Sequence, residues 1–337
     1  MATLKPNGSN DRNQNAEWSI LSDEKSSGQA ALEHCDVVIG IPTFNEECFV
    51  LETLKSVQSQ THGDFLAVIS DNGSTDKTVE ICRAFCEADR RFVTIAKSRN
   101  GGAASNFQWL LDNTHSPYFM WLGGHDMISK DFLEKHLRAL GDDPTLSLSY
   151  ANRRCINEGS EYIGDRNGGN YHRIAGTPAQ RYRRTFKRMG TAVAVNNLFR
   201  RAALDGIEIK PIIAMDRMVL CQAAFWGQFN KIDEPLYVWR SFMDRKDGAE
   251  ARIVRITGHA SRLPGRLETI MEFQRHFGRL EKSWKERALF GMAVWSRYSK
   301  RFGKDIAAKF CHQLTPARPI TDSAHRLDIG NSDKIMS

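Results

Sequence analysis

The stretch DVVIGIPTFNEE, residues 36–47, decides how the rest of the sequence is interpreted. Its first part, DVVIGIP, is a short apolar run rich in β-branched residues, which is typical of a buried strand. Within the following segment, residues 46–60, apolar residues recur at spacings near one face of a helix: Phe49, Leu51, Leu54 and Val57. The stretch therefore predicts a strand that leads through a polar loop into a helix.

The same alternation continues to about residue 140. Ser74 or Thr75 is the expected N-cap of the second helix. Strands and helices that alternate through short loops predict a parallel sheet covered on both faces. Ligands of such sheets bind at the carboxyl ends of the strands, so the loops that follow them form the candidate site. The further strands are predicted at residues 65–70, 92–96 and 118–122, and the further helices at residues 74–88, 105–112 and 131–140.

Four polar loops follow these strands: IPTFNE, SDNGSTD, KSRNGG and GGHD. Asp71 in the second loop can accept hydrogen bonds from a base or ribose, and the alternative is a turn residue that caps the next helix. Pro42 fixes the backbone after the first strand, and Thr43 or Asn45 can cap the helix. Phe44 offers a stacking surface. The glycines of the third loop either allow close approach to a ligand or form an ordinary tight turn.

The pattern changes from about residue 146. SLSYANRRC predicts one more strand, and residues 158–170 predict a long polar loop. Residues 178–188 predict a basic helix, and a further helix runs from residue 216 to 226, where Gly227 ends it. KIDEPLYVWRSF returns to strand, and residues 250–312 are mostly helical and basic.

Composition narrows the class of protein. The chain has 337 residues, 41% of them hydrophobic, and a formal net charge of +7. This length suffices for one large α/β domain or two smaller ones. The positive charge favours an anionic partner, which can be nucleic acid, a membrane surface or a phosphorylated small molecule. The sequence has neither zinc-finger spacing nor an RNP-type aromatic motif, so no nucleic acid is expected.

The lack of recognisable targeting signals and the pattern of cysteines favour a cytoplasmic protein. No apolar run approaches the about 18 residues of a membrane-spanning helix, and the first residues lack the apolar centre of a secretory signal. The seven cysteines are scattered through apolar stretches without a C-x-x-C pair. We interpret them as buried free thiols in a reducing compartment.

The order and spacing of four motifs point to one family. DVVIGIPTFNEE is followed by VISDNGSTDKT, RNGGAASN and YFMWLGGHDMISKDFLEKHL, and from Asp36 to Leu140 this series resembles family 2 glycosyltransferases. The resemblance continues more weakly through NNLFRR, Asp216 and EPLYVWR to Phe242. It implies the GT-A fold, an α/β nucleotide-diphospho-sugar transferase sandwich with a mostly parallel central sheet. It also implies inverting transfer of a sugar from a nucleotide sugar, with a UDP-sugar as the expected donor.

The resemblance sets the expected organisation and function. The acceptor would be a saccharide or a lipid-linked molecule, in surface polysaccharide or glycoconjugate biosynthesis. A non-catalytic sugar-nucleotide-binding protein of the same fold is the alternative. A nucleotidyltransferase would need a glycine-rich basic loop, and none follows DVVIGIP. The expected parts are a disordered tail (1–33), a GT-A catalytic domain (34–245, with a nucleotide-binding half 34–150 and an acceptor half 151–245), a helical extension (246–312) and a polar tail (313–337).

The family pattern also assigns nucleotide-sugar-binding roles residue by residue. Asp71 would hold the base. Pro42, Phe44 and Glu46 would line the base and ribose pocket, and Asn100, Gly102, Asn106 and Gly124 would complete the nucleotide site. Arg240 stands where the family often has a basic residue near the diphosphate, and its fork suits phosphate oxygens. The alternative for Arg240 is an ordinary surface arginine.

GGHD, residues 123–126, stands where the family usually has Asp-x-Asp, whose carboxylates contact the ribose and bind a divalent ion on the diphosphate. Gly123 replaces the first aspartate and His125 the second, whereas Asp126 is retained. The metal site would then consist of His125 and Asp126. Imidazole suits Mn²⁺ better than Mg²⁺. The alternative for His125 is a neutral hydrogen-bonding side chain without a metal.

Asp216 matches the family's catalytic base. A base must take the proton of the acceptor hydroxyl on the face opposite the leaving diphosphate. The alternative is a helix N-cap, a position that favours aspartate. Met215 stands where the family often has a second acidic residue, and Glu208 is the second candidate base.

The basic helices leave two interpretations open. Residues 178–188 are strongly basic, and residues 284–302 mix aromatic side chains with lysines and arginines. Such a segment is typical of a helix that packs on the catalytic domain with a solvated basic face. The alternative is a helix that lies on an anionic bilayer, which would place the protein peripherally at the inner face of the membrane.

Overall fold

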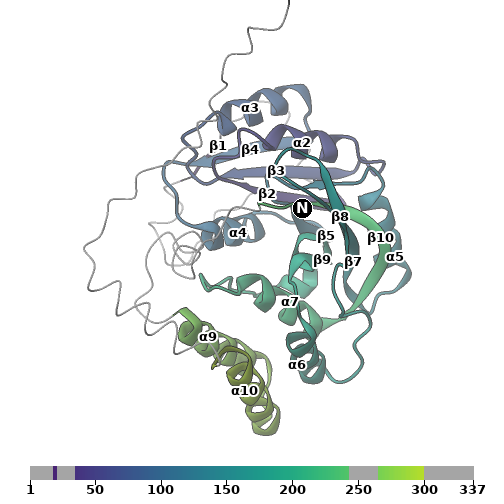
Figure 1. Cartoon of the computed structure of the whole chain (residues 1–337), viewed down its shortest axis with the longest axis vertical. Coiled ribbons are helices and arrows are strands. Elements are labelled where there is room, and N and C mark those ends of the chain that lie inside the picture. The colour runs from purple at the N-terminus through teal and green to yellow at the C-terminus, as the bar shows by residue number, and fades with distance from the viewer. Residues whose placement is uncertain (1–17, 21–34, 243–264, 300–337) are drawn as a thin grey trace, which may run out of the picture.

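A computed structural model describes residues 18–20, 35–242 and 265–299, and it shows a curled ten-stranded sheet with helices on both faces (Figure 1). The strands are β1 (Trp18–Ile20), β2 (Val37–Thr43), β3 (Phe65–Asp71), β4 (Phe92–Lys97), β5 (Tyr118–Trp121), β6 (Met127–Ile128), β7 (Leu146–Ile156), β8 (Tyr162–Arg166), β9 (Leu198–Arg200) and β10 (Gln228–Arg240). The helices are α2 (Val50–Gln58), α3 (Thr78–Ala88), α4 (Ala103–Asp112), α5 (Phe132–Asp142), α6 (Pro178–Arg188), α7 (Met215–Trp226), α9 (Gly265–Leu280) and α10 (Trp284–Tyr298), with the short 3₁₀ helices η2 (Val193–Asn196) and η3 (Arg201–Leu204).

The sheet has the strand order β1-β4-β3-β2-β5-β9-β7-β10-β6, and β8 pairs with β7 outside this path. β4, β3, β2 and β5 run parallel, which confirms the predicted parallel sheet in the first half of the chain. Thr43 at the end of β2 pairs with Asp71 at the end of β3. The loops that follow these two strands therefore start side by side at the carboxyl edge of the sheet.

Alternate residues of the parallel strands enter two separate cores, because successive side chains of a strand point to opposite faces. Val38 of β2 belongs to the core that α4, α6, α7, α9 and α10 cover. Val37 and Ile39 belong to the core that α2, α3 and α5 cover. With both faces covered, every residue of β3 is buried, as expected for a strand inside a parallel sheet.

The predicted start of the second helix is wrong by one turn. α3 begins at Thr78 rather than at residue 74, and its N-cap is Lys77, which makes no side-chain cap bond. Ser74 instead donates its backbone N–H and its hydroxyl to the carboxylate of Asp71. The residues predicted as caps therefore build a turn before the helix, a use for which serine and aspartate are equally suited.

The first helix also starts without the predicted cap. α2 begins at Val50 with Phe49 as its N-cap, so neither Thr43 nor Asn45 caps it. Leu51, which was expected on the packed face, is exposed. The loop after β2 is therefore longer than the sequence indicates, and its polar side chains are directed to other loops.

β8 and β1 lie in segments that were predicted to be a polar loop and a disordered tail. β8 lies inside the predicted polar loop 158–170 and pairs antiparallel with β7. Its residues are exposed or half-buried, so no apolar alternation marks it. β1 lies inside the predicted disordered tail 1–33 and pairs antiparallel with β4.

The C-terminal helices extend the core beyond the sheet. α6 and α7 confirm the two helices predicted at residues 178–188 and 216–226, and Gly227 is the C-cap of α7. α9 and α10 lie side by side to the left of α6 in Figure 1, and α10 contacts both α9 and α6. A helical C-terminal part is thus present. Residues 246–264 and 300–312 of the predicted extension, and the predicted tail 313–337, lie outside the described residues.

Six of the cysteines fall in the described part of the chain, and all six are free thiols, as predicted. Cys48 is exposed, contrary to the expectation of burial, because it lies in the loop between β2 and α2. Among the described helices, none combines the length and the apolar character needed to cross a bilayer.

Candidate active site

The loops after β2 and β3 are joined through the carboxylate of Asp71. Its Oδ2 accepts hydrogen bonds from the backbone N–H groups of Gly73 (3.0 Å) and Ser74 (2.8 Å). Its Oδ1 accepts from Thr43 Oγ1 at 3.3 Å and from the Ser74 hydroxyl. Asp71 is 1% exposed, and burial raises its pKa against these hydrogen bonds, which lower it. Asp71 therefore holds the turn together, and its contact with a base stays a prediction.

Gly73 and Asn72 fasten the third loop to the second. Gly73 has φ +78°, and a Cβ there would lie 2.6 Å from the carbonyl carbon of Arg99. Only glycine lets the two backbones approach so closely. Asn72 Nδ2 donates to Asn100 Oδ1 at 2.9 Å, and Asn72 Oδ1 accepts from the N–H of Gly101 at 3.1 Å.

The residues predicted to shape the floor of the site divide into two groups. Asn100 is exposed at the rim of the loop, and its Oδ1 accepts from the N–H of the buried Gly102 at 2.8 Å. Asn106 is buried and its Nδ2 donates to the carbonyl of Ser70 at 2.8 Å. Asn106 thus joins α4 to β3 beneath the loops, which is a supporting position.

The loop after β2 meets the GGHD loop through Glu46 and His125. His125 Nδ1 lies 2.8 Å from Glu46 Oε1, and the imidazole packs edge-on against Phe242 at 5.0 Å between ring centroids. Gly124 makes this approach possible, because a Cβ there would lie 2.8 Å from Thr43 Cγ2 and 3.3 Å from Glu46 Cγ. The structure therefore brings Glu46, Gly124 and His125 together.

Asp126 is buried at the same place, with 2% of its surface exposed. Tyr237 donates its hydroxyl to Oδ2 at 2.5 Å, and the backbone N–H of Arg240 donates to Oδ1 at 2.8 Å. Burial raises the pKa of the Asp126 carboxyl, although His125 and the Tyr237 hydroxyl act to lower it. Asp126 consequently links the GGHD loop to β10.

This cluster fits a divalent ion poorly. Hard cations take oxygen ligands, carboxylates above all, yet both oxygens of Asp126 already accept bonds from protein donors. Nδ1 of His125 is engaged with Glu46, and Gly123 supplies no ligand. In residues 35–242 and 265–299, no group of three or more His, Cys, Asp or Glu side chains is arranged to hold a metal ion. The arrangement therefore does not favour the predicted site of His125 and Asp126.

Arg240 is buried rather than on the surface, so the surface alternative is wrong. It is 1% exposed, and its guanidinium lies 4.6 Å over the ring of Phe49. Its three side-chain nitrogens all donate to protein acceptors, which explains how the charge is tolerated in the interior. The geometry does not support the expected contact with a diphosphate. The acceptors are His125 O (3.0 Å), Asn157 O (3.2 Å), Glu158 O (3.1 Å), Ser160 Oγ (2.9 Å) and Glu52 Oε2 (2.8 Å).

The two candidate bases differ in their surroundings. Asp216 lies in the first turn of α7, where Ala214 is the N-cap, so the N-cap alternative for Asp216 is wrong. Its Oδ1 accepts from the N–H of Arg217 at 2.8 Å, and the residue is half-buried. Glu208 is exposed and forms an ion pair with Arg279 of α9 at 2.8 Å. Glu208 is thus engaged with a cation of the C-terminal helices, and the role of Asp216 as the base stays a prediction.

Two residues of this cluster were not predicted from the sequence. Tyr237 lies in β10, and the β10–β6 register places it opposite Ile128, beside Asp126. A buried tyrosine usually needs a partner for its hydroxyl, which is the signal that could have identified it. Glu52 on α2 pairs with Arg240, but an acidic residue on the polar face of a helix carries no such signal.

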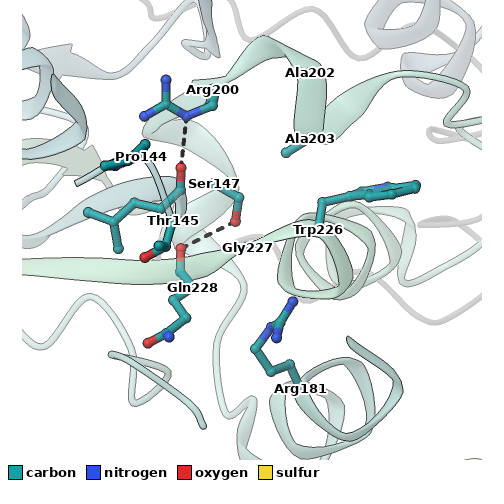
Figure 2. Close-up of a pocket in the computed structure, with 11 residues that line it drawn as sticks. Pro144, Thr145, Ser147, Arg181, Arg200, Ala202, Ala203, Trp226, Gly227 and Gln228 are labelled. Atoms are coloured by element: carbon teal, nitrogen blue, oxygen red, sulfur yellow. Dashed lines mark hydrogen bonds between the residues drawn. The ribbon is translucent and has the colours of Figure 1, made fainter. Parts of the chain in front are cut away.

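A separate pocket of about 450 Å³ lies at the amino ends of β7 and β10 (Figure 2). β7 and β5 are both antiparallel to β9, so this is the opposite edge of the sheet from Asp71. Trp226 forms one wall, and Arg181 and Arg200 are among the lining residues. Both guanidiniums donate to backbone carbonyls in the last turns of α7 and α5. These polar groups serve the fold, and the pocket is not part of the candidate site.

A family model identifies the part of the chain that contains these loops. The model described as Glycosyl transferase family 2 matches residues 38–207, which is half of the chain. The matched range begins in β2 and ends after η3, and it includes the loops that carry Asp71, Asn100 and His125. Asp216, Tyr237 and the C-terminal helices lie beyond it.

Curated relatives match over the same first half. An uncharacterized glycosyltransferase of Rickettsia conorii is 31% identical over 132 residues, which is 39% of this chain and 21% of that protein. The putative teichuronic acid biosynthesis glycosyltransferase TuaG of Bacillus subtilis is 31% identical over 96 residues, 28% of this chain and 38% of that protein. The matches therefore span about a fifth to two fifths of the relatives' own length.

Solved structures share the fold at low sequence identity. S. aureus TarS 1–349 in complex with UDP-GlcNAc superposes with a TM-score of 0.58 at 15% identity, over 83% of this chain and 76% of that one. The mannosyltransferase PcManGT from Pyrobaculum calidifontis, in complex with GDP-Man and Mn²⁺, gives a TM-score of 0.51 at 15% identity, over 90% of this chain and 80% of that one. These likenesses confirm the predicted glycosyltransferase fold.

Proposed function

Because the chain belongs to glycosyl transferase family 2, we propose that it transfers a sugar from a nucleotide sugar to an acceptor hydroxyl with inversion at the anomeric carbon. One observation carries this proposal: three loops, joined by the hydrogen bonds of Asp71, Asn72 and Asn100, converge at the carboxyl edge of a parallel sheet. Open sheets of this kind bind their ligands at that edge.

The proposed donor is a UDP-sugar. Phe44 stands exposed at the rim of the loop after β2, where its ring can stack on a base. Pro42 and Glu46 flank it, and the backbone around Asn100 and Gly102 faces the same edge. The TarS complex contains UDP-GlcNAc, and the common fold supports the same class of donor here.

The proposed reaction is a single displacement. The acceptor oxygen forms a bond to the anomeric carbon while the bond from that carbon to the diphosphate oxygen breaks. The nucleoside diphosphate leaves with the electron pair, and Asp216 takes the proton of the acceptor hydroxyl. Attack from the side opposite the leaving group inverts the anomeric configuration. A well-placed general base contributes on the order of 10² to 10⁴ in rate.

We route no step of this reaction through a metal ion. Asp126 would first have to lose its bonds to Tyr237 and to the backbone of Arg240 before it could bind one. The preference for Mn²⁺ over Mg²⁺, which rests on the imidazole of His125, stays a prediction. It is tested by comparing turnover in Mn²⁺, in Mg²⁺ and in excess chelator.

A donor screen tests the proposed function. Purified protein is incubated with a panel of UDP-, GDP- and dTDP-sugars, and the released nucleoside diphosphate is measured for each. We expect release with at least one UDP-sugar, and its loss in Asp216→Asn. Release with none of the donors, in the presence of saccharide and lipid-linked acceptors, would contradict the proposal.

A second candidate function is binding of a nucleotide sugar without transfer. Gly123 in place of a carboxylate and the burial of Asp126 favour it. Calorimetry distinguishes the two functions, because a binding protein retains affinity for a UDP-sugar while no diphosphate is released.

The acceptor is proposed to be a saccharide or a lipid-linked molecule of a surface polysaccharide or glycoconjugate, made on the cytoplasmic side.

A further inference from the structure

Helix α10 is apolar on two opposite faces. On its inner face Phe290 and Val294 are fully buried. The ring of Phe290 packs against Tyr182 of α6 at 5.1 Å and against Phe277 of α9 at 4.5 Å between centroids. These contacts explain why the inner face of α10 is apolar, since it packs against α6 and α9.

The outer face of α10 carries large apolar side chains that nothing in the described structure covers. Trp284 is 73% exposed, Met292 62%, Trp295 43% and Leu289 39%. Trp284, Ala288, Met292 and Trp295 recur at intervals of four, four and three, so they form one stripe along the helix, and Leu289 lies to one side of it. Exposed apolar patches of this kind mark contact sites.

Cations border this stripe. Lys282, Lys285 and Arg287 are exposed, and the ammonium of Lys285 lies 6.0 Å from the ring of Trp284. Glu286 is the acidic residue of α10, and it is turned inward to Arg183 of α6 at 3.3 Å. The outer face therefore combines tryptophan, methionine and leucine with positive charge. This is the composition of helices that lie in a membrane interface.

We propose that α10 docks through its outer face on an anionic lipid bilayer. Tryptophan side chains would enter the headgroup region, and Lys282, Lys285 and Arg287 would contact the lipid phosphates. A second copy of the chain fits this face less well. α10 offers the lysines and arginine of a second copy no acidic side chain on this face, since Glu286 pairs with Arg183. The docking goes beyond the proposed function, because it depends on α10 and not on sugar transfer.

Vesicle binding tests the proposal with a matched pair of tryptophan variants. The full chain is sedimented with vesicles of phosphatidylglycerol or of phosphatidylcholine, as wild type and as the double variant Trp284→Gln/Trp295→Gln. We expect wild type to prefer the anionic vesicles and the double variant to bind them at least about tenfold more weakly. Trp226→Gln is the control, since this residue is 56% exposed on α7, away from α10. It should bind as wild type does.

The charged border and the orientation are tested separately. Lys285→Gln and Arg287→Gln should each weaken binding to phosphatidylglycerol by about fivefold and reduce its salt dependence. Brominated lipids should quench the tryptophan fluorescence of wild type more than that of the double variant.

Equal vesicle binding by wild type and the double variant would overturn the proposal. So would a dimer, detected by light scattering, that the double variant abolishes while no vesicle binding occurs. Sugar transfer to a water-soluble acceptor should be unchanged in the double variant, so the proposed function and the docking fail independently.

Discussion

Replacing Tyr237 with phenylalanine removes one hydroxyl from the interior and leaves the ring in place. That hydroxyl donates a 2.5 Å hydrogen bond to Oδ2 of Asp126, and both residues are buried. A hydrogen bond to a charged group contributes about 1.5–3 kcal/mol to stability. We therefore expect Tyr237→Phe to lower the free energy of unfolding by about 1.5–3 kcal/mol when the Asp126 carboxyl is ionised.

The loss should depend on pH. Burial raises the pKa of Asp126, so the folded protein binds that proton more tightly than the unfolded chain, whose aspartates titrate near about 3.9. The contribution of Asp126 to stability therefore falls as pH rises from that value through the folded pKa. The Tyr237 hydroxyl lowers the folded pKa by stabilising the ionised form, and its removal raises that pKa further. The variant should lose more stability at about pH 8 than at about pH 4.

Urea unfolding followed by circular dichroism at the two pH values measures this difference. Tyr162→Phe is the control, because Tyr162 is an exposed tyrosine of β8 whose ring lies 5.5 Å from the Arg154 guanidinium, a contact that phenylalanine keeps. It should change stability by less than about 0.5 kcal/mol. A loss for Tyr237→Phe that is equally small, or equal at both pH values, would refute the assignment of this hydroxyl to the Asp126 carboxylate.

Three further predictions concern the loops and the base. Asp216→Asn should lower turnover by about 10² to 10⁴ with unchanged donor affinity, whereas Glu208→Gln should stay active; the opposite result would move the base to Glu208. Gly73→Ala should lower the unfolding free energy by at least about 1–3 kcal/mol, since its backbone is left-handed and its Cβ would meet the next loop. Unchanged urea midpoints would contradict that clash. Glu46→Gln should weaken calorimetric binding of a UDP-sugar by about tenfold through loss of a charged partner for His125; full affinity would remove this pair from the site.

Much of the first half of the fold could be predicted because its signals are local. β2, β3, β4 and β5 are buried runs of β-branched and aromatic residues, and each is bounded by loop residues. The period of the apolar residues separates such strands from helices without any knowledge of tertiary contacts. β8 was not predicted, because its residues are exposed or half-buried and lack the apolar period that identifies the other strands.

The roles of single polar residues could not be predicted, because they depend on partners far away in the chain. Arg240 pairs with Glu52, 188 residues away, and Asp126 meets Tyr237, 111 residues away. A motif identifies the position of Asp126 but not that its two oxygens accept bonds from β10. Asp71 shows that the local sequence can also be ambiguous, because an aspartate at the end of a strand that is followed by Asn and Gly suits a ligand contact and a turn equally well.

The buried guanidinium of Arg240 has a consequence for protein engineering. It links the end of β10 to α2, to the loop between β7 and β8 and to the GGHD loop, so segments far apart in the sequence depend on it. A chimera that joins residues 34–150 of this chain to the second half of a relative would therefore have to supply an arginine and a tyrosine at the matching positions. Recombination within this fold is therefore restricted to parents in which these complementary residues were inherited together.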